Sequence, residues 1–339
     1  MRCLSRSGSS MQMNDRMGFS SSINRRAIIN HGRRAEKSES SWGGLLDAPL
    51  VVGHDRRRTL GMNIELVAVD IDGTLLDSQS RISERDRRAI RAAVERGVRV
   101  ILVTGRRFVI ARPIALELEL TTPLITHNGA LVKHPQTGAV IDYHPLAAPL
   151  ARRVVALGRT VGADLVCCAD PEGLGRALIE RISEHNVRLR QYLDRAPLVV
   201  ERVPDLMAAI RRDPIQIMSS GPCARMDEFE RVLAEDLNGR VTLLKTVYPQ
   251  KDMTILDILA PRCSKAAALA RLVARYGLNR HQVMAIGDNE NDMAMLQFAG
   301  LGVIMGNAQH HLKPAADYVT ASNDESGVAR AIERFILQE

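Results

Sequence analysis

The stretch Val67-Ala-Val-Asp-Ile-Asp-Gly-Thr-Leu-Leu-Asp77 is the part of the sequence on which the interpretation of the fold depends. A mostly apolar run over 64–69 predicts a buried strand, which ends at Asp70, and Gly73 then turns the chain away. Ligands bind at the carboxyl ends of strands in open α/β sheets, so Asp70 and Asp72 indicate a chemical site. The alternative is a turn in which Asp and Gly serve only as turn formers.

The length and composition predict a globular protein of about two domains. The chain has 339 residues, of which 45% are hydrophobic and 25% charged. Only 3% are aromatic, which argues against a base-stacking surface for nucleic acid, and no run of eighteen apolar residues predicts a membrane span. The five cysteines form no C-x-x-C pair, so we expect free thiols in a reducing, cytoplasmic setting.

The positive charge of the chain is concentrated near its start. The net charge is +7, and residues 1–61 hold 11 Lys/Arg against 5 Asp/Glu, which is +6. The remaining residues are therefore nearly neutral, and we expect no nucleic-acid partner. We interpret residues 1–61 as a disordered basic extension, a targeting segment or the product of a start site placed too early, and favour the last with Met62 as the true start.

Strands and helices alternate on both sides of a central stretch with a different pattern. Ser83 begins a predicted helix and Gly97 ends it. Residues 147–250 mix helices with short strands, and a hairpin over 131–144 precedes them. We predict a doubly wound parallel sheet in an α/β core, residues 62–146 and 251–339, interrupted by an α+β domain. The predicted strands of this parallel sheet are 64–69, 98–103, 123–126, 253–259, 282–286 and 301–305.

Polar residues gather where these strands end or where the next helix begins. The four groups are Asp70 with Asp72, Thr104 with Gly105, Lys265, and the run Gly287-Asp-Asn-Glu-Asn-Asp292. A hydroxyl and free backbone N–H groups suit a phosphate, and a lysine at a helix N-terminus is best explained by a nearby anion. Acidic oxygens are the ligands that Mg²⁺ prefers. The sequence therefore predicts a joint metal and phosphate site.

Each group can be given a chemical task at such a site. Asp70, Asp72 and Asp288 offer oxygen ligands for Mg²⁺. Asp70 can attack phosphorus to form an aspartyl-phosphate, while Asp72 protonates the leaving oxygen and later takes a proton from water. The side chains expected to balance charge on the transferred group are those of Lys265, Thr104 and Asn291.

Short motifs along the chain resemble, in their order and in their residues, those of one known family. The motifs are Asp70-Ile-Asp-Gly-Thr, Thr104-Gly-Arg, Lys265, Gly287-Asp-x-x-Asn-Asp292, Asn128-Gly-Ala, Met305-Gly-Asn-Ala and Ser326-Gly-Val-Ala. Over residues 62–339 they resemble the haloacid dehalogenase superfamily, and within it the Cof-like sugar-phosphate phosphatases. The resemblance implies a Rossmann-like core, a large α/β cap over residues 147–250 and a Mg²⁺ cofactor. It also implies a metal contact at Asn289, phosphate contacts at Ile71 and Gly105, and supporting roles for Asp292, Asn128 and Arg106.

Several residues are left with open or structural interpretations. Arg106 either pairs with phosphate or covers a surface, and Asp257, inside an apolar strand, is assigned a structural role over a substrate contact. We expect His127 to be a satisfied histidine at the rim of the site. Adjacent Cys167 and Cys168 should point to opposite faces of a strand.

The resulting hypothesis is a Mg²⁺-dependent phosphatase that hydrolyses small phosphorylated metabolites, such as sugar phosphates, through an aspartyl-phosphate. One alternative is a phosphotransferase or mutase on the same core. Another is a protein that binds a phosphorylated metabolite without catalysis, which the presence of Asp70, Asp72, Lys265 and Asp288 argues against. We expect a monomer or weak homodimer with no membrane association.

Overall fold

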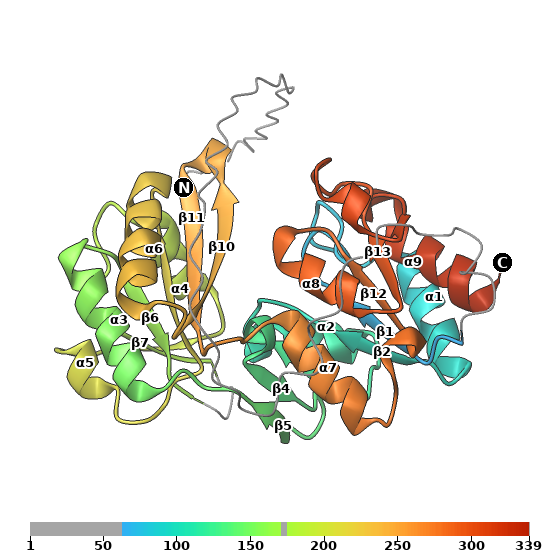
Figure 1. The fold of residues 1–339 in the computed structure, drawn as a ribbon, viewed down its shortest axis with the longest axis horizontal. Coiled ribbons are helices and arrows are strands. Elements are labelled where there is room, and N and C mark those ends of the chain that lie inside the picture. Colours follow the sequence, from blue (N-terminus) through green and yellow to red (C-terminus); the bar gives the residue numbers. More distant parts are fainter. Residues whose placement is uncertain (1–62, 171–174, 339) are drawn as a thin grey trace, which may run out of the picture. The chain divides into compact units, whose positions relative to one another are not determined.

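The computed structural model describes residues 63–170 and 175–338 (Figure 1). The predictions for residues 1–61 and for Met62 as a start lie outside these ranges. Within them, no helix is both long enough and apolar enough to cross a membrane.

A five-stranded parallel sheet positions most of the predicted site residues. All its neighbouring strands pair in parallel, and β1 is an interior strand of the sheet. The observed order shows the crossovers of a doubly wound sheet, as predicted. In spatial order the strands are β14 (Tyr318–Val319), β13 (Leu301–Ile304), β12 (Val283–Gly287), β1 (Leu66–Val69) and β2 (Arg99–Leu102).

Helices cover both faces of this sheet because alternate residues of each strand point to opposite faces. In β1, Val67 and Val69 pack with helices α1, α2 and α9, whereas Leu66 and Ala68 pack with α7 and α8. All four side chains are fully buried, so this strand belongs to the interior of the molecule. The helices are α1 (Glu84–Glu95), α2 (Phe108–Glu117), α7 (Lys265–Arg275), α8 (Glu290–Phe298) and α9 (Gly327–Ile332).

Local sequence signals set the ends of α1 as predicted. The Ser83 side chain accepts a hydrogen bond from the backbone N–H of Asp86 and caps the helix. Gly97 follows the last turn with a φ of 82°, a left-handed conformation that glycine adopts without strain. These two predictions are confirmed.

The third predicted parallel strand belongs mainly to a small antiparallel sheet. β3 (Leu124–Thr126) pairs with β4 (Leu131–Lys133), which pairs with β5 (Val140–Tyr143), so the predicted hairpin is confirmed. A single parallel bridge, between Val103 and Ile125, joins β3 to the end of the five-stranded sheet. That bridge brings the loops after β2 and β3 together.

A second, six-stranded sheet contains a strand that we expected in the parallel sheet. Residues 253–259 form β11, which pairs antiparallel with β9 and β10, so the prediction of a parallel core strand there is wrong. A short apolar run predicts a buried strand but does not specify its partners. In spatial order the strands are β10 (Thr242–Tyr248), β11 (Met253–Leu259), β9 (Gln216–Gly221), β6 (Leu165–Cys168), β7 (Arg176–Ile179) and β8 (Val199–Arg202).

Helices also flank this sheet. α3 (Ala148–Thr160) and α6 (Cys223–Leu237) pack side by side (Figure 1), and Cys167 packs in their cluster. α4 (Val187–Arg195) packs with alternate strand residues in a separate cluster, and Cys168 faces a third cluster, which confirms the predicted opposite orientation of the two cysteines. The exact domain boundaries stay a prediction.

Three details of the helices and strands differ from the sequence-based prediction. The helix expected over 204–212 is only α5 (Leu206–Ala209), and the helix expected near 309–315 is a 3₁₀ turn, Lys313–Ala315. Strands β7 and β8 were not predicted. Each has only four residues, and such short runs carry a weak periodic signal.

Candidate active site

Three buried charged side chains form the centre of the site. Lys265 Nζ lies 2.6 Å from Asp70 Oδ1 and 2.7 Å from Asp292 Oδ1. Asp70 follows β1, Lys265 begins α7 and Asp292 lies in α8, so three distant segments supply them. The Lys265 ammonium thus has a carboxylate on each side, in the interior of the protein. We call Asp70, Lys265 and Asp292, together with Asp288, the catalytic cluster.

A fourth charged residue, Asp288, approaches the turn after β1. Its Oδ1 accepts a hydrogen bond from Thr74 Oγ1 at 3.0 Å. A Cβ atom on Gly73 would lie 2.4 Å from Asp288 Oδ2, so only glycine permits this approach. Carboxylate oxygens of Asp70, Asp288 and Asp292 all lie within 4.8 Å of one another.

The catalytic cluster holds more acidic groups than Lys265 can neutralise. Burial raises the pKa of Asp288 to about 7, and the Asp292 carboxylate adds to the rise. Burial also raises the pKa of Asp70 well above its usual range, with Asp292 contributing and Lys265 opposing. Crowded carboxylates of this kind, with hard oxygen donors, fit a divalent cation such as Mg²⁺. Asp70 and Asp288 are the residues that would hold it, since both oxygens of Asp292 are already engaged, one by Lys265 and the other by backbone N–H groups.

Asp72 lies apart from this group of acids. Its carboxylate accepts two hydrogen bonds from the Arg106 guanidinium, from Nε at 2.8 Å and from Nη2 at 2.6 Å. The Asp72 side chain is 60% exposed. The structure therefore brings Asp70 and Asp288 together but not the Asp72 carboxylate, and Asp72 as metal ligand and as proton donor stays a prediction.

Two predicted phosphate residues, Thr104 and Gly105, follow β2, and a third, Asn291 in α8, reaches the predicted supporting residue Asn128 after β3. Thr104 is buried, and its Oγ1 accepts a hydrogen bond from the backbone N–H of Arg106 at 3.0 Å. Asn128 accepts a hydrogen bond from Asn291 Nδ2 at 3.4 Å. A Cβ atom on Gly105 would lie 2.9 Å from Asn128 Oδ1, so this backbone passes directly over the amide.

Asp292 also fixes the loop that carries Asp288. Its Oδ2 accepts hydrogen bonds from the backbone N–H groups of Asp288, at 3.2 Å, and Asn289, at 3.1 Å. Asn289 caps α8, and its side chain accepts from the backbone of Glu290. Ile71, between the two aspartates of the first motif, is completely buried. The predicted contact of Asp292 with Lys265 is therefore observed, whereas the metal contact of Asn289 stays a prediction.

A second polar group, which we call the junction cluster, comprises the buried Arg107, His127 and Gln216 and the half-buried Asp257. Arg107 is only 5% exposed, and among the residues that the structure describes neither of its Nη atoms has a hydrogen-bond partner. Its guanidinium lies 5.8 Å from the centroid of the Tyr192 ring. Sequence reasoning missed Arg107 and Gln216, because one arginine among many and one glutamine in a strand carry no distinctive pattern.

His127 differs from its prediction as a satisfied histidine at the rim. It is buried, and its Nδ1 has no partner within the described ranges. Burial lowers the pKa of His127 to about 3, and the Arg107 charge adds to the lowering, so the ring is neutral. Asp257 accepts hydrogen bonds from Gln216 Nε2 at 2.8 Å and from Asn128 Nδ2 at 3.1 Å.

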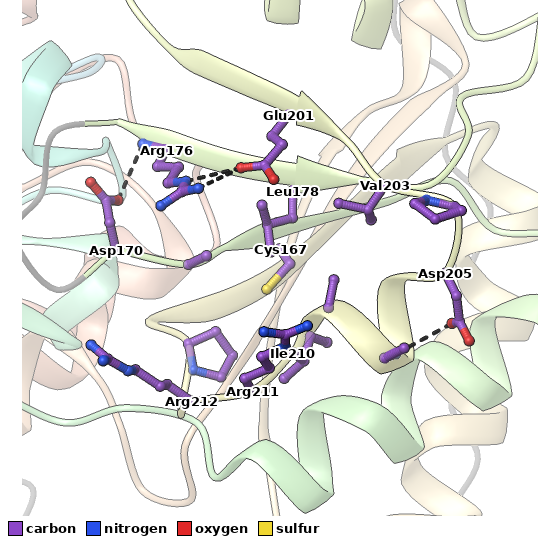
Figure 2. A pocket seen from close by; sticks show the side chains of 15 residues that line it. Cys167, Asp170, Arg176, Leu178, Glu201, Val203, Asp205, Ile210, Arg211 and Arg212 are labelled. Carbon is purple, nitrogen blue, oxygen red and sulfur yellow. Dashed lines mark hydrogen bonds and ion pairs between the residues drawn. The ribbon is translucent and has the colours of Figure 1, made fainter.

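A cavity of about 840 Å³ in the described part of the chain lies elsewhere. Figure 2 shows it between β6, β7 and β8 and the segment that carries Arg211 and Arg212. Cys167 and Leu178 form part of its apolar wall, and Arg176 pairs with Glu201 at its edge. None of the predicted site residues lines this cavity, so volume alone does not mark the active site.

Comparison with known proteins agrees with the site. The family model for haloacid dehalogenase-like hydrolases matches residues 67–332. The chain is 30% identical to the 5-amino-6-(5-phospho-D-ribitylamino)uracil phosphatase YcsE of Bacillus subtilis (strain 168) over 276 residues, which cover 81% of this chain and 97% of that protein. A similarly named phosphatase of that organism, YitU, is 29% identical over 80% of this chain and 97% of its own length.

Solved structures share the fold. A haloacid dehalogenase-like hydrolase from Bacteroides thetaiotaomicron superposes with a TM-score of 0.69 at 29% identity, covering 80% of this chain and 99% of that one. The parallel sheet with helices on both faces and the added second sheet define an α/β protein with an acidic site beside the parallel sheet. The chain belongs to the haloacid dehalogenase-like hydrolase family. The predicted resemblance, fold class and enzyme class, a phosphatase of this family, are therefore confirmed.

Proposed function

We propose that this protein is a Mg²⁺-dependent phosphatase that hydrolyses small phosphorylated metabolites through an aspartyl-phosphate. The observation that carries the proposal is the buried Lys265 ammonium between Asp70 and Asp292, with Asp288 beside them. A nucleophilic carboxylate next to a fixed cation and further acids is suited to a phosphoryl group, whose transfer depends on positioning and electrostatics.

The residues divide the reaction between them. Asp70 attacks phosphorus, the bond to the leaving oxygen breaks, and Asp72 gives that oxygen a proton. Water then attacks the phosphorus of the aspartyl-phosphate, Asp72 takes its proton, and phosphate leaves. Lys265, already 2.6 Å from Asp70, offsets negative charge on the transferred group. Mg²⁺ held by Asp70 and Asp288 would supply the remaining positive charge.

The exposed position of Asp72 suits a proton carrier. Its side chain is held by Arg106 alone among the described residues, so the carboxyl can rotate toward the leaving oxygen without disturbing the buried centre. Thr104, Gly105 and Asn291 are the proposed phosphate contacts, with Ile71 contributing its backbone. Arg106 is then a partner of the proton carrier.

For the substrate, we propose a phosphomonoester with a hydroxyl-rich leaving group, such as a sugar or polyol phosphate. Two relatives are named for a substrate with a phosphorylated ribityl chain, which supports this class. A panel of candidate substrates should contain that compound together with sugar phosphates, nucleotides and phosphoglycolate. The compound with the highest kcat/KM identifies the substrate class.

Turnover of p-nitrophenyl phosphate, with Mg²⁺ and with EDTA, tests the chemistry. We expect turnover only with the metal, and a loss of at least about 10³-fold in Asp70→Asn, because the amide cannot attack phosphorus. Undiminished turnover in Asp70→Asn would exclude Asp70 as nucleophile. Transfer of phosphate to an added alcohol in preference to water would indicate a phosphotransferase instead.

A further inference from the structure

A chain of hydrogen bonds joins the six-stranded sheet to the candidate phosphate site. Gln216 on β9 donates to Asp257 on β11, and Asn128 Nδ2 donates to the other oxygen of that carboxylate at 3.1 Å. Asn291 Nδ2 in turn donates to Asn128 Oδ1 at 3.4 Å. Asn291 is a proposed phosphate contact, so this chain runs from one sheet into the site of the other.

The chain fixes the orientation of each amide in it. An ionised carboxylate only accepts hydrogen bonds, so Asp257 requires the NH₂ group of Asn128 to face it. The oxygen of Asn128 must then point the opposite way, toward Asn291, which has to present its own NH₂ group. One N–H of Asn291 is engaged with Asn128, and the second remains for a phosphate oxygen.

Asn128 is packed so closely that the orientation of its amide affects neighbouring groups. Asn128 is 3% exposed and adopts a left-handed backbone conformation, with a φ of 53°. Its amide lies so close to Gly105 that a Cβ atom there would be 2.9 Å from Oδ1. A rotation of the Asn128 amide would therefore disturb two proposed phosphate contacts, Asn291 and the Gly105 backbone.

We propose that Asp257 is a positioning residue for phosphate binding, which acts by orienting Asn128 and, through it, Asn291 and Gly105. The inference rests on the proposed phosphatase function. It assigns a task to a carboxylate that the sequence leaves without one. It also makes phosphate binding at one sheet depend on a side chain from the other.

The test is the inhibition constant of inorganic phosphate against p-nitrophenyl phosphate, measured on the full chain with Mg²⁺ at pH 8. For Asp257→Asn we expect a roughly tenfold weaker phosphate inhibition and a similar rise in KM, with kcat changed less than threefold, as is typical for a residue that orients a ligand-binding group. The matched control is Asp236→Asn, which makes the same change on α6, where Asp236 pairs with Arg153. It should leave all three constants unchanged.

A reciprocal exchange tests whether the two side chains act as a pair. Asn128→Asp alone places two carboxylates against each other and should weaken phosphate inhibition by more than Asp257→Asn does. The combined variant N128D/D257N again sets a donor against an acceptor and should bind phosphate at least threefold more tightly than N128D alone. The proposal is overturned if the fold-changes in phosphate inhibition caused by N128D and by D257N simply multiply in the combined variant, because the two side chains then act independently.

The outcomes separate this inference from the function on which it rests. A wild-type chain that neither hydrolyses p-nitrophenyl phosphate nor binds phosphate contradicts the proposed function. An active wild type whose phosphate inhibition is within twofold of that of D257N contradicts the positioning role alone. If D257N does not fold, Asn128→Ala tests the same link, and unchanged phosphate inhibition in that variant contradicts it too.

Discussion

The catalytic cluster and the junction cluster are both largely buried, yet their charged atoms are paired very differently. Lys265 has carboxylate oxygens at 2.6 and 2.7 Å, whereas Arg107 has no hydrogen-bond partner at either Nη atom within the described residues. Removing one partner of a buried ion pair lowers the free energy of unfolding, and burying a charge that has no partner lowers it as well. The Lys265 ammonium is therefore held in place by its two partners, whereas we expect the buried Arg107 charge to reduce the stability of the fold.

The largest expected effect is on stability and comes from Lys265→Met. Removing the cation leaves the Asp70 and Asp292 carboxylates buried without compensation, so the free energy of unfolding should fall by about 3–5 kcal/mol. Urea denaturation in EDTA measures it. The matched control is Lys245→Met, because Lys245 also contacts two acids, Asp227 and Glu230, but at the surface. Lys245→Met should lower the free energy of unfolding by less than about 1 kcal/mol. Equal losses in Lys245→Met and Lys265→Met would contradict the distinction between a surface site and a buried one.

A smaller effect concerns the pH dependence that Asp257 contributes. Burial raises the pKa of Asp257 to about 7, although Arg107 and the amides of Asn128 and Gln216 oppose the rise. Between the unfolded pKa, near 4, and about 7 the folded state keeps the proton that the unfolded state has lost, so wild-type stability falls as pH rises.

Asp257→Asn removes this titration. Between pH 4.5 and pH 7.5, the difference in free energy of unfolding between Asp257→Asn and the wild type should shift in favour of the variant by on the order of 2 kcal/mol. Thermal or urea unfolding of both proteins across this range checks the trend. A difference between them that stays constant with pH would show that Asp257 is ionised throughout.

The smallest expected effect is that of Arg107→Met, which removes a buried cation. Because neither Nη atom has a hydrogen-bond partner among the described residues, we expect the free energy of unfolding to stay the same or to rise by about 1 kcal/mol. Arg159→Met is the control, since Arg159 pairs with Glu180 and Asp205 at the surface. A loss of more than about 2 kcal/mol in Arg107→Met would mean that a water or ligand pairs with the guanidinium in solution.

Local patterns in the sequence determined strands β1, β2, β12 and β13 of the parallel sheet, the helices that follow the first three of them and most of the catalytic cluster. Apolar strands followed by Asp70, Thr104 and Asp288 could be recognised because the carboxyl ends of parallel strands share one edge. Lys265 at a helix start indicated a nearby anion, and the structure places the carboxylates of Asp70 and Asp292 beside it. These inferences depend on neighbours in sequence and on general rules of topology, which a single chain reveals.

Only the tertiary structure decided which distant side chains meet. The run 253–259 predicts a buried strand equally well for either sheet, and pairing with β9 and β10 placed Asp257 against Asn128. The bidentate pairing of Asp72 with Arg106, and the burial of the Arg107 guanidinium without a hydrogen-bond partner at its Nη atoms in the described ranges, likewise depend on packing between segments far apart in the chain. Periodicity records which side of an element is buried, but it does not record which partner covers that side.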